Sequence, residues 1–272
     1  MSENKTENAV SKIISCAKKI VIKIGSNTLA KENGELNYEF MHNLAKTVRE
    51  FFEDGKQIVL VSSGAQVSGL ATIKNWKRKT DVHYRQALCA IGQVELMDKW
   101  RSVFREYDLH IGQLLFTKDD FENDHRSLNI RNTLFTLTDE GVIPIVNEND
   151  SVSFDEIRIG DNDNLSALTA VLWNADVLIL LSDIDGVYTD NPKTNRDAHL
   201  ISEVRDVDEL RSKIKIGATN EFGTGGIATK LDAAKLANSY GIPLVLARGT
   251  NDALFKLSNG NANATIFLSN EN

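Results

Sequence analysis

Cysteine and proline are scarce in this chain of 272 residues, which contains two cysteines and three prolines. Cys16 and Cys89 are too few and too far apart to form a disulfide framework or a zinc site with paired ligands. The scarcity of cysteine therefore favours a cytoplasmic protein in a reducing environment. The scarcity of proline allows long helices to run without interruption.

Long apolar runs and an excess of basic residues are also missing. No segment approaches the roughly 18 apolar residues of a membrane-spanning helix, so we expect no membrane association. The 31 lysines and arginines are outnumbered by 38 aspartates and glutamates, which gives a formal net charge of -7. This charge argues against nucleic acid as a partner, but it allows a local basic pocket for a small anion. The polar beginning of the chain predicts a flexible tail over residues 1–15.

Short apolar segments alternate with segments of helical length, and this alternation predicts an α/β fold with a mainly parallel sheet. Most of the predicted strands are continuously apolar, as expected of strands that helices cover on both faces. The predicted strands are residues 20–24, 58–61, 111–116, 142–146, 177–181, 243–246 and 265–268. The predicted helices are residues 38–53, 84–107, 127–140, 165–174 and 228–240.

Two acidic and amide-rich runs are the most informative feature that the chain does contain. They have the sequences NEND at residues 147–150 and GDNDN at residues 160–164. Carboxylates and amides packed so densely repel one another and cost desolvation, unless cations or ligand donors neutralise them. The two runs therefore indicate a binding or catalytic site.

Polar residues follow several of the predicted strands, at the point where each strand ends. They are Lys23, Ser63, the NEND run, Ser182 and Asp183. In open α/β sheets ligands bind beyond the carboxyl ends of the strands, so we expect these residues to converge on one composite site. Taken singly, each has a plainer interpretation, because a lysine at a strand end can be solvated and serine or aspartate can cap a helix or a turn.

A glycine-rich segment, residues 223–230, opens the last predicted long helix and ends at Lys230. Such a turn presents main-chain N–H groups and the positive end of the helix dipole to an anion, so we expect it to hold phosphate, although a simple helix cap is an equal alternative. Its spacing differs from that of a Walker A loop. Together with Lys23 and an aspartate, Lys230 could clamp a phosphoryl group during transfer, since charge neutralisation drives such reactions.

Five segments of the chain resemble the glutamate 5-kinases, a family of the amino acid kinase superfamily that begins proline synthesis. They follow one another over nearly the whole chain. The segments are VIKIGS at 21–26, VSSGA at 61–65, VNEND at 146–150, GDNDNLSA at 160–167 and GTGGIATK at 223–230. The resemblance implies a three-layer α/β/α sandwich in which residues 16–272 form a single domain, with glutamate bound in its N-terminal half and ATP in its C-terminal half. It also implies a form without the C-terminal PUA-type domain that many members carry.

The resemblance also implies a role for each matching residue. Lys23, Lys230 and Asp163 would be catalytic, with Asp163 orienting the two lysines. Asp161 would lie near the α-amino group of glutamate or near the metal shell, and these two roles remain open. The implied glutamate-binding residues are Ser63, Asp150, Asn162 and Asp161. The implied ATP-binding residues are Lys23, Ser182, Asp183, Thr224, Gly225, Gly226, Ile227, Ala228, Thr229 and Lys230.

The implied reaction transfers the γ-phosphoryl group of ATP to the side-chain carboxylate of L-glutamate and gives L-glutamyl 5-phosphate. This carboxylate has an ordinary pKa near 4.3, so it is ionised at neutral pH and needs no general base. The two lysines, with Mg²⁺ carried by ATP and no metal ligand assigned in the protein, would overcome the repulsion between the two anions. Asp150 would select glutamate by pairing with its α-ammonium group.

Two alternatives remain at this stage. One is another amino acid kinase, such as an N-acetylglutamate or aspartate kinase, although an N-acetylated substrate has no α-ammonium group for Asp150. The other is a noncatalytic amino-acid sensor, against which the presence of both Lys23 and Lys230 counts, because a sensor has no transition state to stabilise. The family further implies a homo-oligomer, dimeric or tetrameric, with proline as a feedback inhibitor and transient coupling to glutamyl phosphate reductase.

Overall fold

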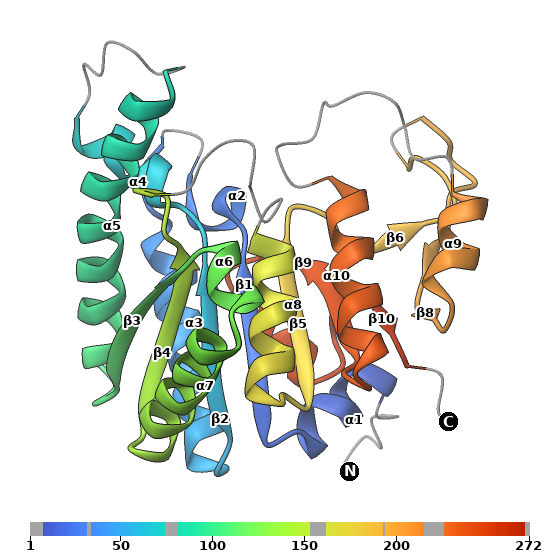
Figure 1. The fold of residues 1–272 in the computed structure, drawn as a ribbon. Helices are drawn as coiled ribbons and strands as arrows, with labels where there is room; N and C mark the ends of the chain where they lie inside the picture. Colours follow the sequence, from blue (N-terminus) through green and yellow to red (C-terminus); the bar gives the residue numbers. More distant parts are fainter. Residues whose placement is uncertain are drawn as a thin grey trace.

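The protein folds around one eight-stranded sheet between two layers of helices (Figure 1). The computed structural model describes residues 8–31, 34–73, 81–152, 162–192, 194–214 and 226–269. The strand order is β3-β4-β2-β1-β5-β9-β10-β8, and only the β9-β10 pairing among these is antiparallel. The strands of this sheet are β1 (Lys19–Ile24), β2 (Gln57–Ser62), β3 (His110–Phe116), β4 (Val142–Glu148), β5 (Val177–Ser182), β8 (Glu203–Val204), β9 (Leu244–Arg248) and β10 (Ala264–Phe267). A two-stranded ribbon consists of β6 (Val187–Tyr188) and β7 (Leu200–Ile201).

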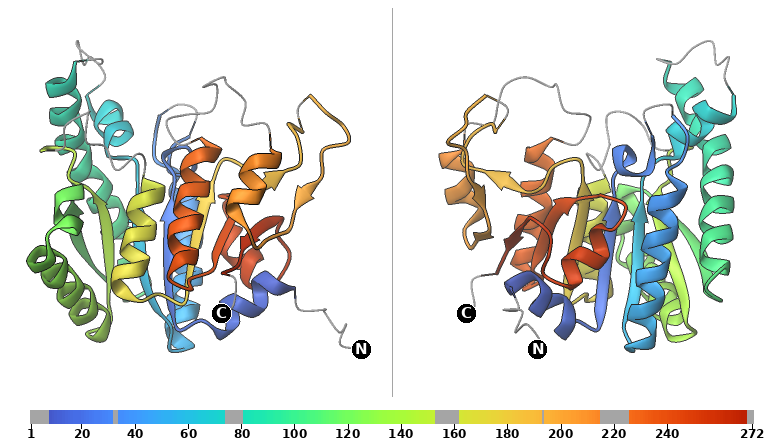
Figure 2. Two further views of the ribbon diagram at one scale, coloured as in Figure 1. Left: turned by 45° about the vertical axis from the view of Figure 1, so that its right-hand side comes forward. Right: turned by 180° about the vertical axis from the view of Figure 1, so that it is seen from behind.

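Helices cover both faces of the sheet, as the two further views in Figure 2 show. One face packs against α1 (Ala9–Cys16), α3 (Tyr38–Glu53), α5 (Val82–Arg105) and α11 (Ala253–Ser258). The other face packs against α7 (Asp124–Asp139), α8 (Asn162–Trp173), α9 (Val207–Lys213) and α10 (Ile227–Ser239). The short helices α2 (Ser26–Leu29), α4 (Ala65–Thr72) and α6 (Lys118–Glu122) complete the fold. The predicted α/β/α sandwich is confirmed, and every predicted strand and helix is present within three residues of its expected bounds.

The N-terminal tail is the part of the predicted organisation that is wrong. We expected residues 1–15 to be flexible, but from residue 9 onward they form α1, whose Val10 and Ile14 are buried in the core. The Asn8 side chain caps the helix by accepting a hydrogen bond from the Ser11 backbone N–H at 2.9 Å. The two apolar residues lie four positions apart on one helical face, and this pairing outweighs the polar neighbours that suggested a tail. Residues 1–7 lie outside the described part of the chain.

Alternation along the strands decides which face each polar side chain occupies. In β1, Ile20, Ile22 and Ile24 belong to the core beneath α3, whereas Val21 belongs to the core beneath α8 and α10. Because side chains of a strand alternate between faces, Lys23 must lie on the same side as Val21. The alternation of side chains along β1 therefore places Lys23 on the face of the sheet that α8 and α10 cover.

No described helix combines the length and apolarity that crossing a membrane would require.

Helices α4 and α5 approach each other closely at two glycines, Gly69 and Gly92. A Cβ atom on Gly92 would lie 1.7 Å from the Ala65 carbonyl oxygen and 2.4 Å from the Gly69 nitrogen. A Cβ atom on Gly69 would lie 2.2 Å from the Leu88 carbonyl oxygen. These contacts are with backbone atoms, which cannot turn aside as a flexible side chain can. Glycine at both positions therefore permits α5 to lie against the start of α4.

Gly92→Ala should destabilise the protein, by about 1–3 kcal/mol or more, because the added methyl group must push α4 away from α5. Helix propensity alone would favour alanine by about 1 kcal/mol. A net decrease in the free energy of unfolding would therefore come from the steric clash. Urea denaturation of the two proteins tests this. Equal or higher stability of the variant would show that the two helices do not pack as described.

Candidate active site

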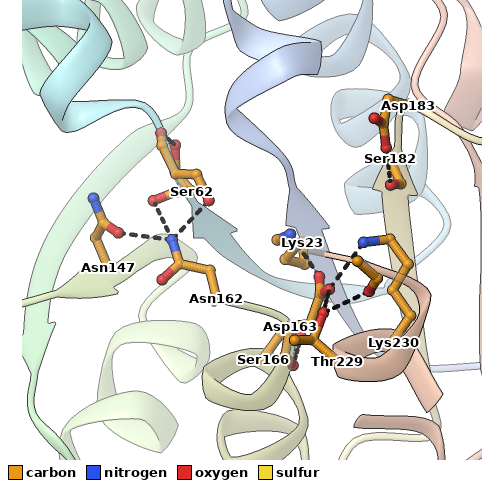
Figure 3. Close-up of polar contacts among 12 residues, drawn as sticks. Lys23, Ser62, Asn147, Asn162, Asp163, Ser166, Ser182, Asp183, Thr229 and Lys230 are labelled. Carbon is orange, nitrogen blue, oxygen red and sulfur yellow. Dashed lines mark hydrogen bonds and ion pairs between the residues drawn. The ribbon is translucent and has the colours of Figure 1, made fainter. Parts of the chain in front are cut away.

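Lys23, Asp163 and Lys230 form a buried cluster at one end of the sheet (Figure 3). The Lys23 Nζ lies 2.5 Å from Asp163 Oδ1, and the Lys230 Nζ lies 3.1 Å from Asp163 Oδ2. Each lysine is 3% exposed and Asp163 is fully buried. The two ammonium groups, which come from distant parts of the sequence, therefore share one carboxylate. The structure thus brings these three predicted residues together at one end of the sheet.

Each member of the cluster is placed by the start or end of a regular element. Lys23 is the penultimate residue of β1, and Asp163 is the second residue of α8. Lys230 stands in the first turn of α10, which packs beside α8. A carboxylate in the first turn of a helix is stabilised by the positive end of the helix dipole. The cluster therefore depends on ordinary strand and helix geometry.

The charge of the cluster is unbalanced in favour of binding an anion. Burial by itself raises the pKa of Asp163, but the ammonium groups of Lys23 and Lys230 lower it by more, so the pKa lies below its ordinary value. Asp163 is thus ionised at neutral pH, and within this trio two ammonium groups share one carboxylate in a buried place. An added anion would find both attraction and ammonium donors there.

Two hydroxyl groups complete the surroundings of Asp163. Thr229 Oγ1 lies 3.0 Å from Asp163 Oδ2 and 2.9 Å from the Gly226 carbonyl oxygen, so its single proton can be donated to either. Ser166 Oγ donates to the Asp163 carbonyl oxygen at 2.6 Å. Both carboxylate oxygens of Asp163 are therefore engaged by groups of the protein, which suits an orienting role better than the role of a base or a metal ligand.

A second polar cluster is centred on Asn162, the residue that precedes Asp163. The Asn162 Nδ2 donates to Ser63 Oγ at 2.8 Å and to Asn147 Oδ1 at 2.9 Å, and lies 3.4 Å from the Ser62 carbonyl oxygen. Because Ser63 Oγ accepts a bond from Asn162, its own proton can be donated to a ligand. We call Ser63, Asn147 and Asn162 the amide cluster, and Lys23, Asp163 and Lys230 the lysine cluster. Because Asn162 and Asp163 are consecutive residues at the start of α8, they join the two clusters.

The carboxyl end of β5 contributes a third group. Ser182 Oγ donates to Asp183 Oδ1 at 2.9 Å, and Figure 3 places this pair on the side of Lys230 that is remote from Asn162 and Asn147. Lys23 and Lys230 therefore lie between the amide cluster and the Ser182 pair. This order fits two ligands that meet at the lysines.

The remaining predicted site residues differ in how far the structure places them. Asp150 lies half-buried in the turn after β4. Gly226 is the N-cap of α10, and as a glycine it has no side chain to cap the helix. Ile227, Ala228 and Thr229 form the first turn with Lys230. The predicted residues Asp161, Thr224 and Gly225 lie outside the described part of the chain.

Sequence reasoning gave no role to several polar residues that belong to the amide cluster or contact it. Asn147 stood in the NEND run, so the run did signal it. Gln93 and Trp100 of α5 carried no signal, because a single glutamine or tryptophan in an amphipathic helix matches no motif. Their contacts depend on how α5 packs against the strand ends, which no local pattern records.

Comparison with known proteins agrees with this geometry. The sequence model of the amino acid kinase family matches residues 18–248. A glutamate 5-kinase of Alkaliphilus metalliredigens is 58% identical, over 95% of this chain and 98% of the relative. A glutamate 5-kinase of Treponema pallidum (strain Nichols) is 44% identical, over 94% of this chain and 98% of the relative. One from Methanococcoides burtonii is 42% identical, over 95% of this chain and 70% of the relative.

Solved structures share the fold at low sequence identity. A carbamate kinase from Giardia lamblia bound to AMP-PNP superposes with a TM-score of 0.67 at 13% identity, covering 94% of this chain and 100% of that one. UMP kinase from Bacillus anthracis superposes with a TM-score of 0.63 at 16% identity, covering 94% and 97%. Fold, family model and close relatives all lead to one assignment: the chain belongs to the amino acid kinase family and, within it, to the glutamate 5-kinases.

Proposed function

We propose that this protein transfers the γ-phosphoryl group of ATP to the side-chain carboxylate of L-glutamate, the first step of proline synthesis. The observation that carries the proposal is the buried cluster in which Lys23 and Lys230 share Asp163, because it offers two ammonium groups to a pair of reacting anions. The relatives at 58% and 44% identity, which are glutamate 5-kinases, support the choice of glutamate as acceptor.

The reaction needs charge neutralisation more than proton transfer. An oxygen of the glutamate carboxylate attacks the γ-phosphorus, the bond to the β-phosphate oxygen breaks, and ADP leaves with the electron pair of that bond. The products are ADP and L-glutamyl 5-phosphate, and no proton moves because the carboxylate is already ionised at neutral pH. Lys23 and Lys230 would stabilise the negative charge that spreads over the transferred group.

The family resemblance divides the other residues between the two substrates. We assign glutamate binding to Ser63, Asn162, Asp150 and Asp161. We assign Asp163 to orienting the two lysines. We assign ATP binding to Lys23, Ser182, Asp183, Thr224, Gly225, Gly226, Ile227, Ala228, Thr229 and Lys230.

Magnesium would enter this site with the nucleotide. In the described ranges, no group of three or more histidine, cysteine, aspartate or glutamate side chains could hold a metal ion. Asp163, the carboxylate that lies between the two lysines, has both oxygens engaged by ammonium and hydroxyl donors. We assign Mg²⁺ to the phosphates of ATP, where it would supply further neutralisation of their charge.

A direct assay tests the proposed function. Wild-type protein with MgATP and L-glutamate should release ADP in a coupled assay and should form an acyl phosphate that hydroxylamine traps as a hydroxamate. L-Aspartate and N-acetyl-L-glutamate should be poor acceptors in the same assay. Inactivity toward glutamate together with activity toward either of these compounds would overturn the proposal in favour of another amino acid kinase. Binding of glutamate without any ADP release would favour a sensor.

Asp150→Asn should weaken glutamate binding selectively. The α-ammonium of glutamate would lose a charged partner, and the KM for glutamate should rise by about ten- to a hundredfold, the effect of one charge-assisted hydrogen bond. The KM for ATP should stay within about twofold, because Asp150 belongs to the glutamate side. Steady-state kinetics with each substrate varied in turn measures both values.

The matched control for this variant is Asp54→Asn. Asp54 is exposed and precedes β2, so it lies at the opposite end of the sheet, and its replacement should change neither KM. The preference for glutamate over N-acetylglutamate should also shrink in Asp150→Asn alone. Equal increases of both KM values in Asp150→Asn would remove Asp150 from recognition of the ammonium group.

Oligomeric state, inhibition and coupling to the next enzyme are proposed from the family resemblance. We propose a cytoplasmic homo-oligomer in which residues 16–272, together with the rest of α1, form one domain. We propose proline as a feedback inhibitor that overlaps the glutamate pocket. The acyl phosphate product is labile, which makes transient coupling to glutamyl phosphate reductase advantageous.

A further inference from the structure

Two polar side chains of the glutamate side point away from the lysine cluster and toward α5. In β2, Ile58 and Leu60 belong to the core beneath α3 and α5, so alternation places Ser62 on that face. In β4, Ile143 and Ile145 belong to the same core, which places Asn147 there too. Ser62 is fully buried and Asn147 is 3% exposed. Each of them therefore has a hydrogen-bond partner on α5, the helix that covers these strand ends.

Trp100 of α5 fixes the end of β2. Its indole N–H donates to Ser62 Oγ at 3.0 Å, and the Ser62 hydroxyl donates in turn to the Ser63 carbonyl oxygen at 3.1 Å. Trp100 is fully buried. This chain of bonds runs from the C-terminal part of α5 to the main chain of Ser63, the residue whose hydroxyl faces Asn162.

Gln93 of α5 fixes the end of β4. Its Oε1 accepts a hydrogen bond from Asn147 Nδ2 at 3.2 Å, and Asn147 Oδ1 accepts from Asn162 Nδ2 at 2.9 Å. The backbone N–H of Glu148 also donates to Asn147 Oδ1, at 2.9 Å. Since that backbone group can only donate, the Asn147 amide has one orientation, and its nitrogen requires an acceptor where Gln93 stands.

The other half of the Gln93 amide is not satisfied. Its Nε2 is buried and has no hydrogen-bond partner in the described part of the structure, although the residue is only 9% exposed. Burying an unpaired donor opposes folding, and a methionine of similar length would fill the space without that penalty. The stability of the fold therefore does not explain a glutamine here. Its hydrogen bond to Asn147, the one bond of its side chain to the described residues, does explain it.

Both side chains lie on one rigid support. Gln93 and Trp100 are seven residues apart, which is close to two helical turns, so they project from the same face of α5. The close contact at Gly92 locks α5 against α4, which begins at Ala65, two residues after Ser63. One helix thus contacts the ends of β2 and β4 and the start of α4.

We propose that Gln93 and Trp100 are positioning residues that hold Asn162 and Ser63 in the geometry that binds glutamate. This inference rests on the proposed function, because it specifies how that function's acceptor site is held. The hydrogen bonds described for Gln93 and Trp100 lead to Asn147 and Ser62, on the glutamate side of the site. Their loss should therefore raise the KM for glutamate and leave the KM for ATP unchanged.

Gln93→Met is the first test. Methionine keeps the volume and removes the acceptor of Asn147, so the KM for glutamate should rise about tenfold, the effect of one misplaced hydrogen bond. The KM for ATP should stay within about twofold. The melting temperature should change little, because the unsatisfied donor of Gln93 is lost while the Asn147 amide nitrogen loses its acceptor. An unchanged KM for glutamate would overturn the proposal.

A packing control separates positioning from loss of stability. Leu96, on the same helix, is fully buried in the core and makes no polar contact with the site. Leu96→Ala should lower the melting temperature and leave the KM for glutamate within about twofold of wild type. If Leu96→Ala raises that KM as much as Gln93→Met, the effect of Gln93 is one of general packing, and the proposal fails.

A double variant tests whether Gln93 acts through Asn147. Gln93→Met should have no further effect on the KM for glutamate once Asn147→Ala has removed the side chain that it orients. Fold changes that multiply would show that the two residues act independently and would overturn the proposal. Trp100→Phe, which keeps a ring but removes the indole N–H, should raise the same KM by about two- to fivefold. These outcomes are distinct from failure of the proposed function, in which wild-type protein itself would not phosphorylate glutamate.

Discussion

Lys230→Ala should lower kcat by about a hundred- to a thousandfold and leave the KM for glutamate nearly unchanged. Lys230 lies 3.1 Å from Asp163, on the ATP side of the cluster, where the transferred phosphoryl group would gather charge. Losing one preorganised donor to such a group typically costs this much in rate. The remaining pair, Lys23 with Asp163, is balanced in charge, so the fold should tolerate the change. Steady-state kinetics and a thermal unfolding curve check both statements.

Lys235→Ala is the matched control for this prediction. Lys235 lies on the same helix five residues further on, where its ammonium pairs with exposed Asp208 at 2.7 Å. Removing this surface charge should leave kcat within about twofold of wild type, since exposed pairs contribute little. A Lys230→Ala variant whose loss appears only as a higher KM would show that the ammonium binds the ground state and does not stabilise the transition state.

The order of strands and helices could be predicted from sequence because it depends on short-range patterns. The helix over Tyr38–Glu53 shows apolar residues at spacings of three and four, and its bounds agree with the prediction. Helix α1 was missed, since two buried residues among polar neighbours give a weak signal. The small strands β6, β7 and β8 have two residues each, which is too short for any period to appear.

The candidate site could be predicted in part for a different reason. The rule that ligands bind at strand ends brought Lys23 and Ser63 to one end of the sheet, and the resemblance supplied Asp163 as their neighbour. The strand period also determines which face each residue occupies. Gln93 and Trp100 could not be found in this way, because the register of α5 over the strand ends depends on tertiary contacts such as that at Gly92.

Asp163→Asn should abolish most of the activity and lower the stability of the protein as well. The two ammonium groups would remain side by side with no carboxylate between them, and the amide nitrogen would face donors instead of acceptors. Breaking a buried ion pair by removing one partner costs about 3–5 kcal/mol. Activity should fall by about a thousandfold, because the lysines lose the group that fixes their positions. Urea denaturation and steady-state assays measure the two effects, and Asp208→Asn, at the exposed pair, should show neither.

The stability lost in Asp163→Asn should depend on pH, in a direction that the pKa of Asp163 determines. The pKa of Asp163 lies below its ordinary value in the folded protein, because the ammonium groups of Lys23 and Lys230 outweigh the effect of burial. A carboxyl group with a lowered folded-state pKa stabilises the fold fully above its unfolded pKa, and the stabilisation is lost as the pH falls through the folded value. The difference in unfolding free energy between wild type and Asp163→Asn should therefore be constant from about pH 8 to pH 5 and shrink below about pH 4. A difference that grows on acidification would mean that Asp163 is protonated in the native protein, and the lysine cluster would then lack the charge on which the mechanism depends.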